Sequence, residues 1–264
     1  MSFPLLFAGV LLTLSPVGMS LVAQLGHARA VLTATVRAVP QLNVVSAIVV
    51  VIVRPVPWTI TFLAVMFTVA TATSAGRMRA ERRGYWAALP IAAGVIPTLG
   101  VLLLTRAIQP EGLELIPVGG IPLGGAMTVT ALAGQRALDA LRNRRGEREA
   151  ALALGLASRE ATILMCRDAA AKALVPALDQ TRTVGLVTLP GTFVGMLLGG
   201  ANPIEAGAVQ VLVLIALLAA ESIAITVCIE VVAAILISTE NVGNQEQIQK
   251  AVRISRESRR RSPA

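Results

Sequence analysis

Long apolar stretches follow one another along this chain, with short polar segments between them. A helix that crosses a bilayer needs about 20 mostly apolar residues. Seven windows approach that length, at residues 3–24, 38–53, 56–75, 86–105, 115–134, 183–201 and 208–237. The pattern predicts an all-α, polytopic membrane protein with about seven transmembrane helices. We expect one transmembrane domain over residues 1–237 and a basic cytoplasmic tail over residues 238–264.

The composition excludes an ordinary soluble fold. The chain is 55% hydrophobic and 14% charged, with a mean hydropathy of +0.74, whereas a soluble domain carries about 25% charged residues. The two cysteines, Cys166 and Cys228, give no disulfide framework. The single histidine and these scattered thiols reveal no transition-metal cluster by their spacing, so the sequence leaves metal ligands unknown.

Basic residues mark one side of the predicted membrane domain. Of the 23 Lys and Arg residues, 21 lie in four segments between or after the apolar windows, namely residues 25–37, 76–85, 135–182 and 238–264. Because positive residues stay on the cytoplasmic side, we predict that the N-terminus lies outside the inner (plasma) membrane and the C-terminus in the cytoplasm. The net charge of +8 then faces anionic lipid, and no nucleic-acid partner is needed to explain it.

One basic segment, residues 140–178, carries frequent charges in an alanine-rich sequence. Glu149 to Leu154 favour a helix, Gly155 can end it, and Ser158 can cap a second helix. The alanines leave a surface that another protein can approach closely. The alternative is a solvated loop with some helical content.

Two patterns in and after this segment resemble those of ABC-transporter permeases. Glu149-Ala150-Ala151 followed by Gly155 resembles the EAA-x-x-x-G coupling motif of ABC importers, a short cytoplasmic helix that docks into the ATPase subunit. Residues 152–206 are similar to the signature block of the FetB-type iron-export permeases, a family that includes the membrane partner of a plant aluminium-tolerance ABC transporter. The similar features include Arg167-Asp168, ALVP at 173–176, VGLVTLPG at 184–191 and Asn202-Pro203. The resemblance extends over residues 25–235.

This resemblance implies the permease subunit of an ABC transporter that exports iron or another metal cation by ATP-driven alternating access. Two copies would pair with two ATPase subunits. The resemblance places the ATPase-coupling residues at Glu149, Ala150, Ala151, Gly155, Arg159, Arg167 and Asp168. Neither lysine, Lys172 or Lys250, follows a glycine, so this chain has no P-loop. We therefore expect it not to be an enzyme and to hold no cofactor, with ATP and Mg²⁺ bound by the separate ATPase.

Three alternatives stay open at this point. The chain could be an ATP-independent carrier or channel, an ABC permease for a non-metal substrate such as a nucleotide sugar, or a membrane scaffold that transports nothing. Co-purification of an ATPase separates the ABC permeases from the other two, and flux into liposomes separates a carrier from a scaffold.

Polar residues within the last apolar window are candidates for a transport path. A charge in lipid costs about 2.5–3.5 kcal/mol on the insertion scale, so an intramembrane carboxylate is a functional candidate. On a helical wheel, Gln210, Glu221 and Cys228 share one face, which favours either a cation path or a buried structural hydrogen bond or ion pair. Glu230 lies on the opposite face, where it can pair with an arginine.

Two further groups of residues are candidates for gating and for helix packing. Arg37 and Gln41 lie four residues apart at the start of the second window, where they can gate the path or anchor the helix at the membrane surface. The sixth window contains small residues and a proline at helical spacing, namely Pro190, Gly191, Gly195 and Gly199. Such residues let helix backbones meet, either within the chain or between two copies of it.

Overall fold

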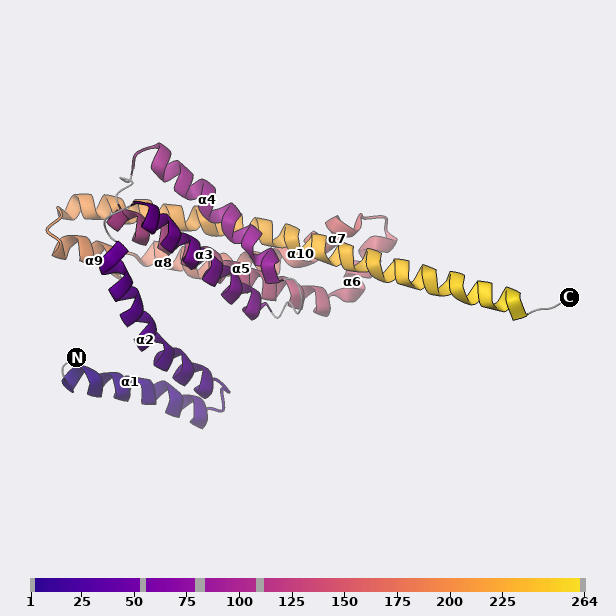
Figure 1. Ribbon diagram of the computed structural model, residues 1–264, viewed down its shortest axis with the longest axis horizontal. Helices are drawn as coiled ribbons and strands as arrows, with labels where there is room; N and C mark the ends of the chain where they lie inside the picture. The colour runs from indigo at the N-terminus through magenta and orange to yellow at the C-terminus, as the bar shows by residue number, and fades with distance from the viewer. Residues whose placement is uncertain (1–2, 53–55, 79–83, 108–111, 262–264) are drawn as a thin grey trace. The chain divides into compact units, whose positions relative to one another are not determined.

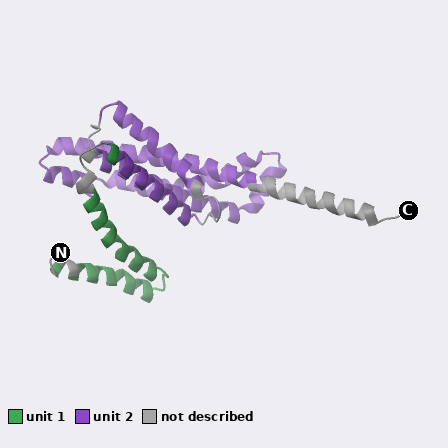
Figure 2. Cartoon of the chain, viewed as in Figure 1, with its two compact units in different colours: residues 1–58 green, residues 59–264 purple. Residues whose placement is uncertain are grey.

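The computed structural model describes the backbone of residues 3–52, 56–78, 84–107 and 112–261, and most of their side chains as far as residue 238. Within these ranges the secondary structure is helical, and only one isolated β-bridge occurs. The predicted all-α fold is confirmed. By its contacts the chain divides into two compact units, residues 1–58 and 59–264 (Figure 2).

The first unit is a pair of helices joined by a short turn. α1 (Phe3–Val22) and α2 (Ala28–Ile52) pack against each other. In the turn, the backbone N–H of His27 donates to the buried hydroxyl of Ser20 at 3.1 Å. α2 begins ten residues before the predicted window at 38 and continues through Pro40, since membrane helices tolerate an internal proline.

The second unit begins within α3 (Val56–Arg77) and contains the remaining helices. Its longer helices are α4 (Ala88–Leu104), preceded by the 3₁₀ turn η1 (Gly84–Ala87), α5 (Gly112–Asn143) and α10 (Pro203–Arg261). Between α5 and α10 come the shorter helices α6 (Arg145–Ala153), α7 (Ser158–Ala171), η2 (Lys172–Leu174), α8 (Val175–Thr183) and α9 (Gly191–Leu198) (Figure 1).

α5 and α10 lie side by side at the centre of the second unit, with α4 packed on α10 and α7 packed on both α5 and α10 (Figure 1). Small residues let membrane helices approach closely. The fully buried alanines on the two central helices are Ala126, Ala133, Ala137, Ala206, Ala220, Ala224 and Ala233. At Gly94 of α4 two helix backbones approach closely, because an added side chain would overlap the backbone carbonyl of Ala220.

α5 and α10 run parallel, so the chain must return between them. Two cavities show this direction. One is lined by residues between 121 and 132 of α5 and by residues 217 and 221 of α10. The other is lined by later residues of both helices, between 130 and 142 of α5 and between 228 and 236 of α10. Residues 173–180 line the first cavity as well. α7, η2 and α8 therefore form the return path, antiparallel to α5, and α8 lies beside the middle of α5 instead of beyond its end.

The sixth predicted window, residues 183–201, is not one helix, and that prediction is wrong. α8 ends at Thr183, and Gly185 then takes a φ of +79° and donates its N–H to the carbonyl of Thr188 at 2.9 Å. α9 begins only at Gly191 and is eight residues long. A helix of that length rises about 12 Å, which is too short to cross a bilayer.

The remaining apolar helices fit a polytopic membrane protein, as predicted. Among the described residues, four segments are long and apolar enough to cross a membrane, and they are Ala28–Ile48, Pro57–Arg77, Leu115–Asn143 and Pro203–Ser238. Phe7–Val22 and Ala88–Leu104 are shorter apolar helices. α10 continues to Arg261, so the basic stretch expected as a tail extends the last helix.

Candidate functional site

α6 carries the Glu-Ala-Ala sequence and ends at Ala153, two residues before Gly155, which terminates it as predicted. The N–H of Gly155 donates to the carbonyl of Leu152 at 3.0 Å, and the N–H of Leu156 donates to the carbonyl of Ala151 at 3.2 Å. These two bonds form a Schellman motif, which requires a residue in the left-handed region. Gly155 has a φ of +93°, a conformation in which a side chain is strained. The glycine therefore sets the direction in which the chain leaves α6.

Arg148 of α6 ties this helix to α7. Its guanidinium donates to the hydroxyl of Ser158 at 2.9 Å and to that of Thr162 at 3.1 Å. α7 begins at Ser158, and Ala157 occupies the N-cap position, so the predicted cap at Ser158 is wrong by one residue. The serine hydroxyl accepts a hydrogen bond from Arg148.

Two more arginines of this region form ion pairs on its surface. Arg144 donates to the carboxylate of Glu147, with an Nε–Oε2 distance of 3.0 Å, and to the carbonyl of Met165 at 3.2 Å. The hydrogen bond from Arg144 lowers the pKa of Glu147 below its usual range. Arg145 pairs with Glu149, Nε to Oε1, at 2.9 Å. The carboxylate of the predicted coupling motif is therefore oriented within α6.

A fourth arginine joins α7 to the long helix α10. Arg159 binds Glu230 through two bonds, Nε to Oε2 at 3.0 Å and Nη2 to Oε1 at 2.5 Å. The expectation that Glu230 pairs with an arginine is confirmed. Arg167 and Asp168, also predicted as coupling residues, form an exposed pair with each other at 3.6 Å. A continuous set of contacts thus runs from α6 through α7 to α10.

The outer surface of α6 is small and only partly polar. Glu149, Ala150 and Ala153 are exposed, and Leu154 is 83% exposed. Ala151 is buried, so the third residue of the predicted motif packs inward instead of facing a partner. We name the exposed surface of residues 149–155 the α6 surface. It offers a protein partner a carboxylate, small side chains and one leucine.

The three polar residues predicted to share a face of the last window are all buried on α10, but neither of the two cavities described for this unit brings them together. Glu221 lines a cavity of about 330 Å³ between α5, α8 and α10. Cys228 lines a separate cavity, and Gln210 is not among the described residues that line either. Arg37 and Gln41, the predicted gating residues, lie exposed on α2 in the other unit.

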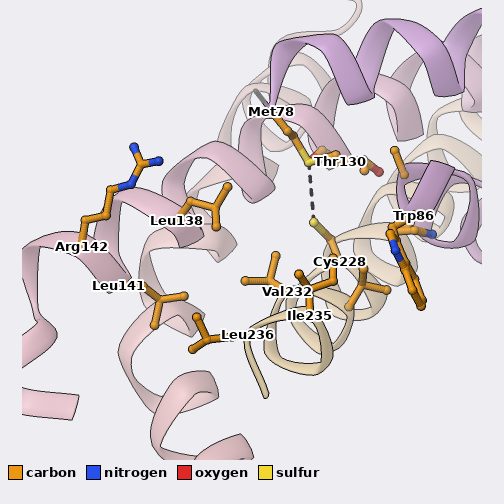
Figure 3. A pocket seen from close by; sticks show the side chains of 13 residues that line it. Met78, Trp86, Thr130, Leu138, Leu141, Arg142, Cys228, Val232, Ile235 and Leu236 are labelled. Atoms are coloured by element: carbon orange, nitrogen blue, oxygen red, sulfur yellow. Dashed lines mark hydrogen bonds between the residues drawn. The ribbon is translucent and has the colours of Figure 1, made fainter. Parts of the chain in front are cut away.

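The cavity at Cys228 is apolar and measures about 290 Å³ (Figure 3). Met78, Trp86, Leu138 and Val232 are among its lining side chains. The Cys228 thiol donates to the backbone carbonyl of Thr130 at 3.6 Å. Its sulfur therefore has a partner within the helix packing.

The small residues of the sixth window lie around α9. Pro190 precedes the helix, and Gly199 ends it. An added Cβ at Gly191 or Gly195 would meet nothing within 4 Å in this chain. These glycines therefore do not pack against another helix of the described chain, and their contact with a second copy stays a prediction.

Several residues of these sites could not be found from the sequence. Arg148 and its two partners are separated by the turn at Gly155, so no helical periodicity relates them. Thr128 and Gln180 share the Glu221 cavity, but Gln180 belongs to the basic segment 135–182, which the charge pattern placed on the cytoplasmic side of the membrane. Among the described residues, no group of three or more His, Cys, Asp or Glu could hold a metal ion.

Comparison with known proteins identifies the family. The family described as Uncharacterised protein family (UPF0014) matches residues 3–237.

The UPF0014 membrane protein STAR2 of Oryza sativa subsp. japonica is 35% identical over 78% of this chain and 74% of its own length. Protein ALUMINUM SENSITIVE 3 of Arabidopsis thaliana is 38% identical over 60% of this chain and 58% of its own. The probable iron export permease protein FetB of Escherichia coli (strain K12) is 33% identical over 52% of each chain. No solved structure matches. This chain therefore belongs to the UPF0014 family of membrane proteins.

Proposed function

We propose that this protein is the transmembrane permease subunit of an ABC exporter for iron or another metal cation. The family relationship supports a permease, because one relative carries that name together with iron export. The observation that carries the ATP-driven part is the α6 surface, which ends at a glycine with positive φ and is fixed to the rest of the chain by arginines.

The linkage from α6 to α10 suits the transmission of a movement. Arg148 fixes α6 to α7, and Arg159 fixes α7 to Glu230 of α10. A displacement of α6 by a partner is then carried to a helix that contains a candidate membrane span. A solvated loop without such contacts would absorb the displacement.

The partners and orientation follow from this assignment. A separate ABC ATPase binds ATP and Mg²⁺ and docks on the α6 surface from the cytoplasm. Two copies of the permease pair with two ATPase subunits in the inner membrane and alternate between inward-open and outward-open states. The N-terminus lies outside and the C-terminus inside, with α7, η2, α8 and α9 together forming the return between α5 and α10.

Reconstitution tests this function. The permease and its ATPase are placed in liposomes with the ATPase facing outward, and the lumen contains a dye that reports Fe²⁺ or Mn²⁺. Hydrolysable ATP should drive cation into the lumen, while a non-hydrolysable analogue or omission of the ATPase should abolish transport. Equal flux without the ATPase would refute the proposal and favour a carrier or channel.

A further inference from the structure

We propose that the cavity between α5, α8 and α10 binds the transported divalent cation, with the carboxylate of Glu221 as its charged ligand. This inference rests on the proposed transport function and assigns a site to it. We name the space lined by Thr128, Gln180 and Glu221, together with its apolar neighbours, the Glu221 cavity.

Glu221 places a carboxylate in the middle of the helix packing. The residue is 5% exposed, and its Oε2 atom is buried with no hydrogen-bond partner among the described residues. A carboxylate in such a place needs a proton, a positive side chain or a bound cation to offset the loss of water. No lysine or arginine is among the described residues that line the cavity.

The cavity also supplies neutral oxygen atoms. The hydroxyl of Thr128 donates its hydrogen to the carbonyl of Gly124 at 2.9 Å, which leaves the lone pairs of the hydroxyl oxygen available to a cation. Gln180 of α8 also lines the cavity and carries an amide oxygen. Hydroxyl, amide and carboxylate oxygens are ligands that hard divalent cations accept.

The shape of α5 keeps space for the carboxylate. A side chain at Gly125 would come within 2.6 Å of Oε1 of Glu221 and would also overlap Leu217. A side chain at the preceding Gly124 would meet nothing within 4 Å. The Glu221 carboxylate therefore packs directly against the α5 backbone, and open space lies beside it.

The helix α8, which contributes part of the cavity lining, also carries charged residues. Asp179 and Arg182 flank Gln180 on α8 and form an exposed pair at 3.8 Å, with side chains 64% and 74% exposed. α8 lies at the level of the middle of α5, within a candidate membrane span. Charged side chains at that depth face water or protein and not lipid, so the proposed path of a hydrated cation to the cavity runs along α8.

The ligand set indicates the class of cation. One carboxylate with neutral oxygens suits a hard divalent ion such as Mn²⁺, and Fe²⁺ accepts the same ligands. A site with a single charged ligand binds its cation weakly, and a transport site needs weak binding in order to release the ion. The described lining contains no histidine or cysteine. Such a lining is unsuited to tight binding of Zn²⁺ or Cu²⁺.

Mn²⁺ binding to the purified permease in lipid nanodiscs tests this site without the ATPase, so failure here is distinguishable from failure of the transport assay. The signal of free Mn²⁺ in electron paramagnetic resonance measures the bound fraction. Mutation of a residue that only hydrogen-bonds to a metal ligand lowers metal affinity by about 10- to 100-fold. Glu221→Gln removes the charge of a direct ligand, so it should weaken Mn²⁺ binding by more than about tenfold. Gln180→Glu adds a second carboxylate and should strengthen it.

Glu230→Gln is the matched control, because it makes the same change on the same helix at a residue paired with Arg159. It should bind Mn²⁺ like the wild type. If Glu221→Gln does not fold, Thr128→Val and Gln180→Leu, each of which removes one neutral ligand, should weaken binding while the elution volume stays unchanged. Absence of Mn²⁺ binding to the wild type, or equal binding by wild type and Glu221→Gln, would overturn the proposal and leave Glu221 as a protonated structural residue.

Discussion

The close approach of α4 to α10 predicts that Gly94→Ala destabilises the protein. A methyl group at this position would overlap the carbonyl oxygen of Ala220 and lie 3.1 Å from its carbonyl carbon and 3.3 Å from Cβ of Ala224. Two of these three atoms belong to the backbone, which no side-chain rotation can move away. The two helices must therefore separate, and the buried contacts between them loosen.

Gly100→Ala is the matched control for this substitution. Gly100 lies in the same helix, and an added Cβ there meets nothing within 4 Å. Replacing glycine by alanine within a helix stabilises the helix by about 1 kcal/mol. This contribution is the same at both positions, so it cancels when the two variants are compared. Overpacking costs about 1–3 kcal/mol. Gly94→Ala should therefore unfold about 2–12 °C below Gly100→Ala, at 2–4 °C for each kcal/mol in a chain of this size.

The two native cysteines provide the assay. Cys166 and Cys228 are 0% and 2% exposed, so a thiol-reactive fluorogenic dye reports their exposure as the protein unfolds in detergent. The unfolding temperatures of the wild type and both variants are compared at one heating rate, since membrane-protein unfolding is often irreversible. Equal unfolding temperatures for the two variants, or a higher one for Gly94→Ala, would refute the close packing of α4 on α10.

Two further predictions concern the link between α7 and α10 and the orientation of the chain. Glu230→Arg should reduce ATP-driven transport while costing at most about 1 kcal/mol of stability, because the paired side chains of Arg159 and Glu230 are 57% and 43% exposed. The exchange Arg159→Glu with Glu230→Arg should restore transport, and a double variant as inactive as the single one would contradict a direct pair. A cysteine introduced at Gln109 should react with a membrane-impermeant maleimide on intact cells, and one at Asn143 only after permeabilisation. Labelling of Asn143 from outside would contradict the predicted topology.

Hydropathy predicted the helical fold and most of the apolar helices, but it failed where the backbone turns within an apolar sequence. Residues 183–201 are as apolar as a membrane-spanning helix. Gly185 nevertheless takes a positive φ, and the next helix begins only after Pro190. Average hydropathy does not distinguish these arrangements. The glycine and proline in VGLVTLPG are the local signal for this break, and averaging hydropathy over the window hides it.

The end of α6 could be predicted because it depends on local chemistry, whereas the Glu221 cavity could not. Gly155 ends a helix through bonds to residues three to five positions earlier, and such bonds leave a sequence pattern. The neighbours of Glu221 come from α5 and α8, and the helical wheel of α10 contains no information about them. The wheel correctly grouped Glu221 with Cys228 on a buried face, but position along the helix separates them into different cavities.

The claim most in need of a direct test is that an ABC ATPase docks on the α6 surface. The measurement is affinity purification of the tagged permease in mild detergent, with mass-spectrometric quantification of any co-purified ABC ATPase. The wild type should retain the ATPase. Glu149→Arg, which reverses the exposed charge, and Gly155→Leu, which is strained at a φ of +93°, should lose it while reaching the membrane in normal amounts.

Glu205→Arg is the control, since it reverses an exposed charge in the first turn of α10, away from α6. It should retain the ATPase as the wild type does. An ATPase that co-purifies equally with the wild type, Glu149→Arg and Gly155→Leu would contradict docking on the α6 surface, and a wild-type permease that retains no ATPase would contradict the ABC assignment itself.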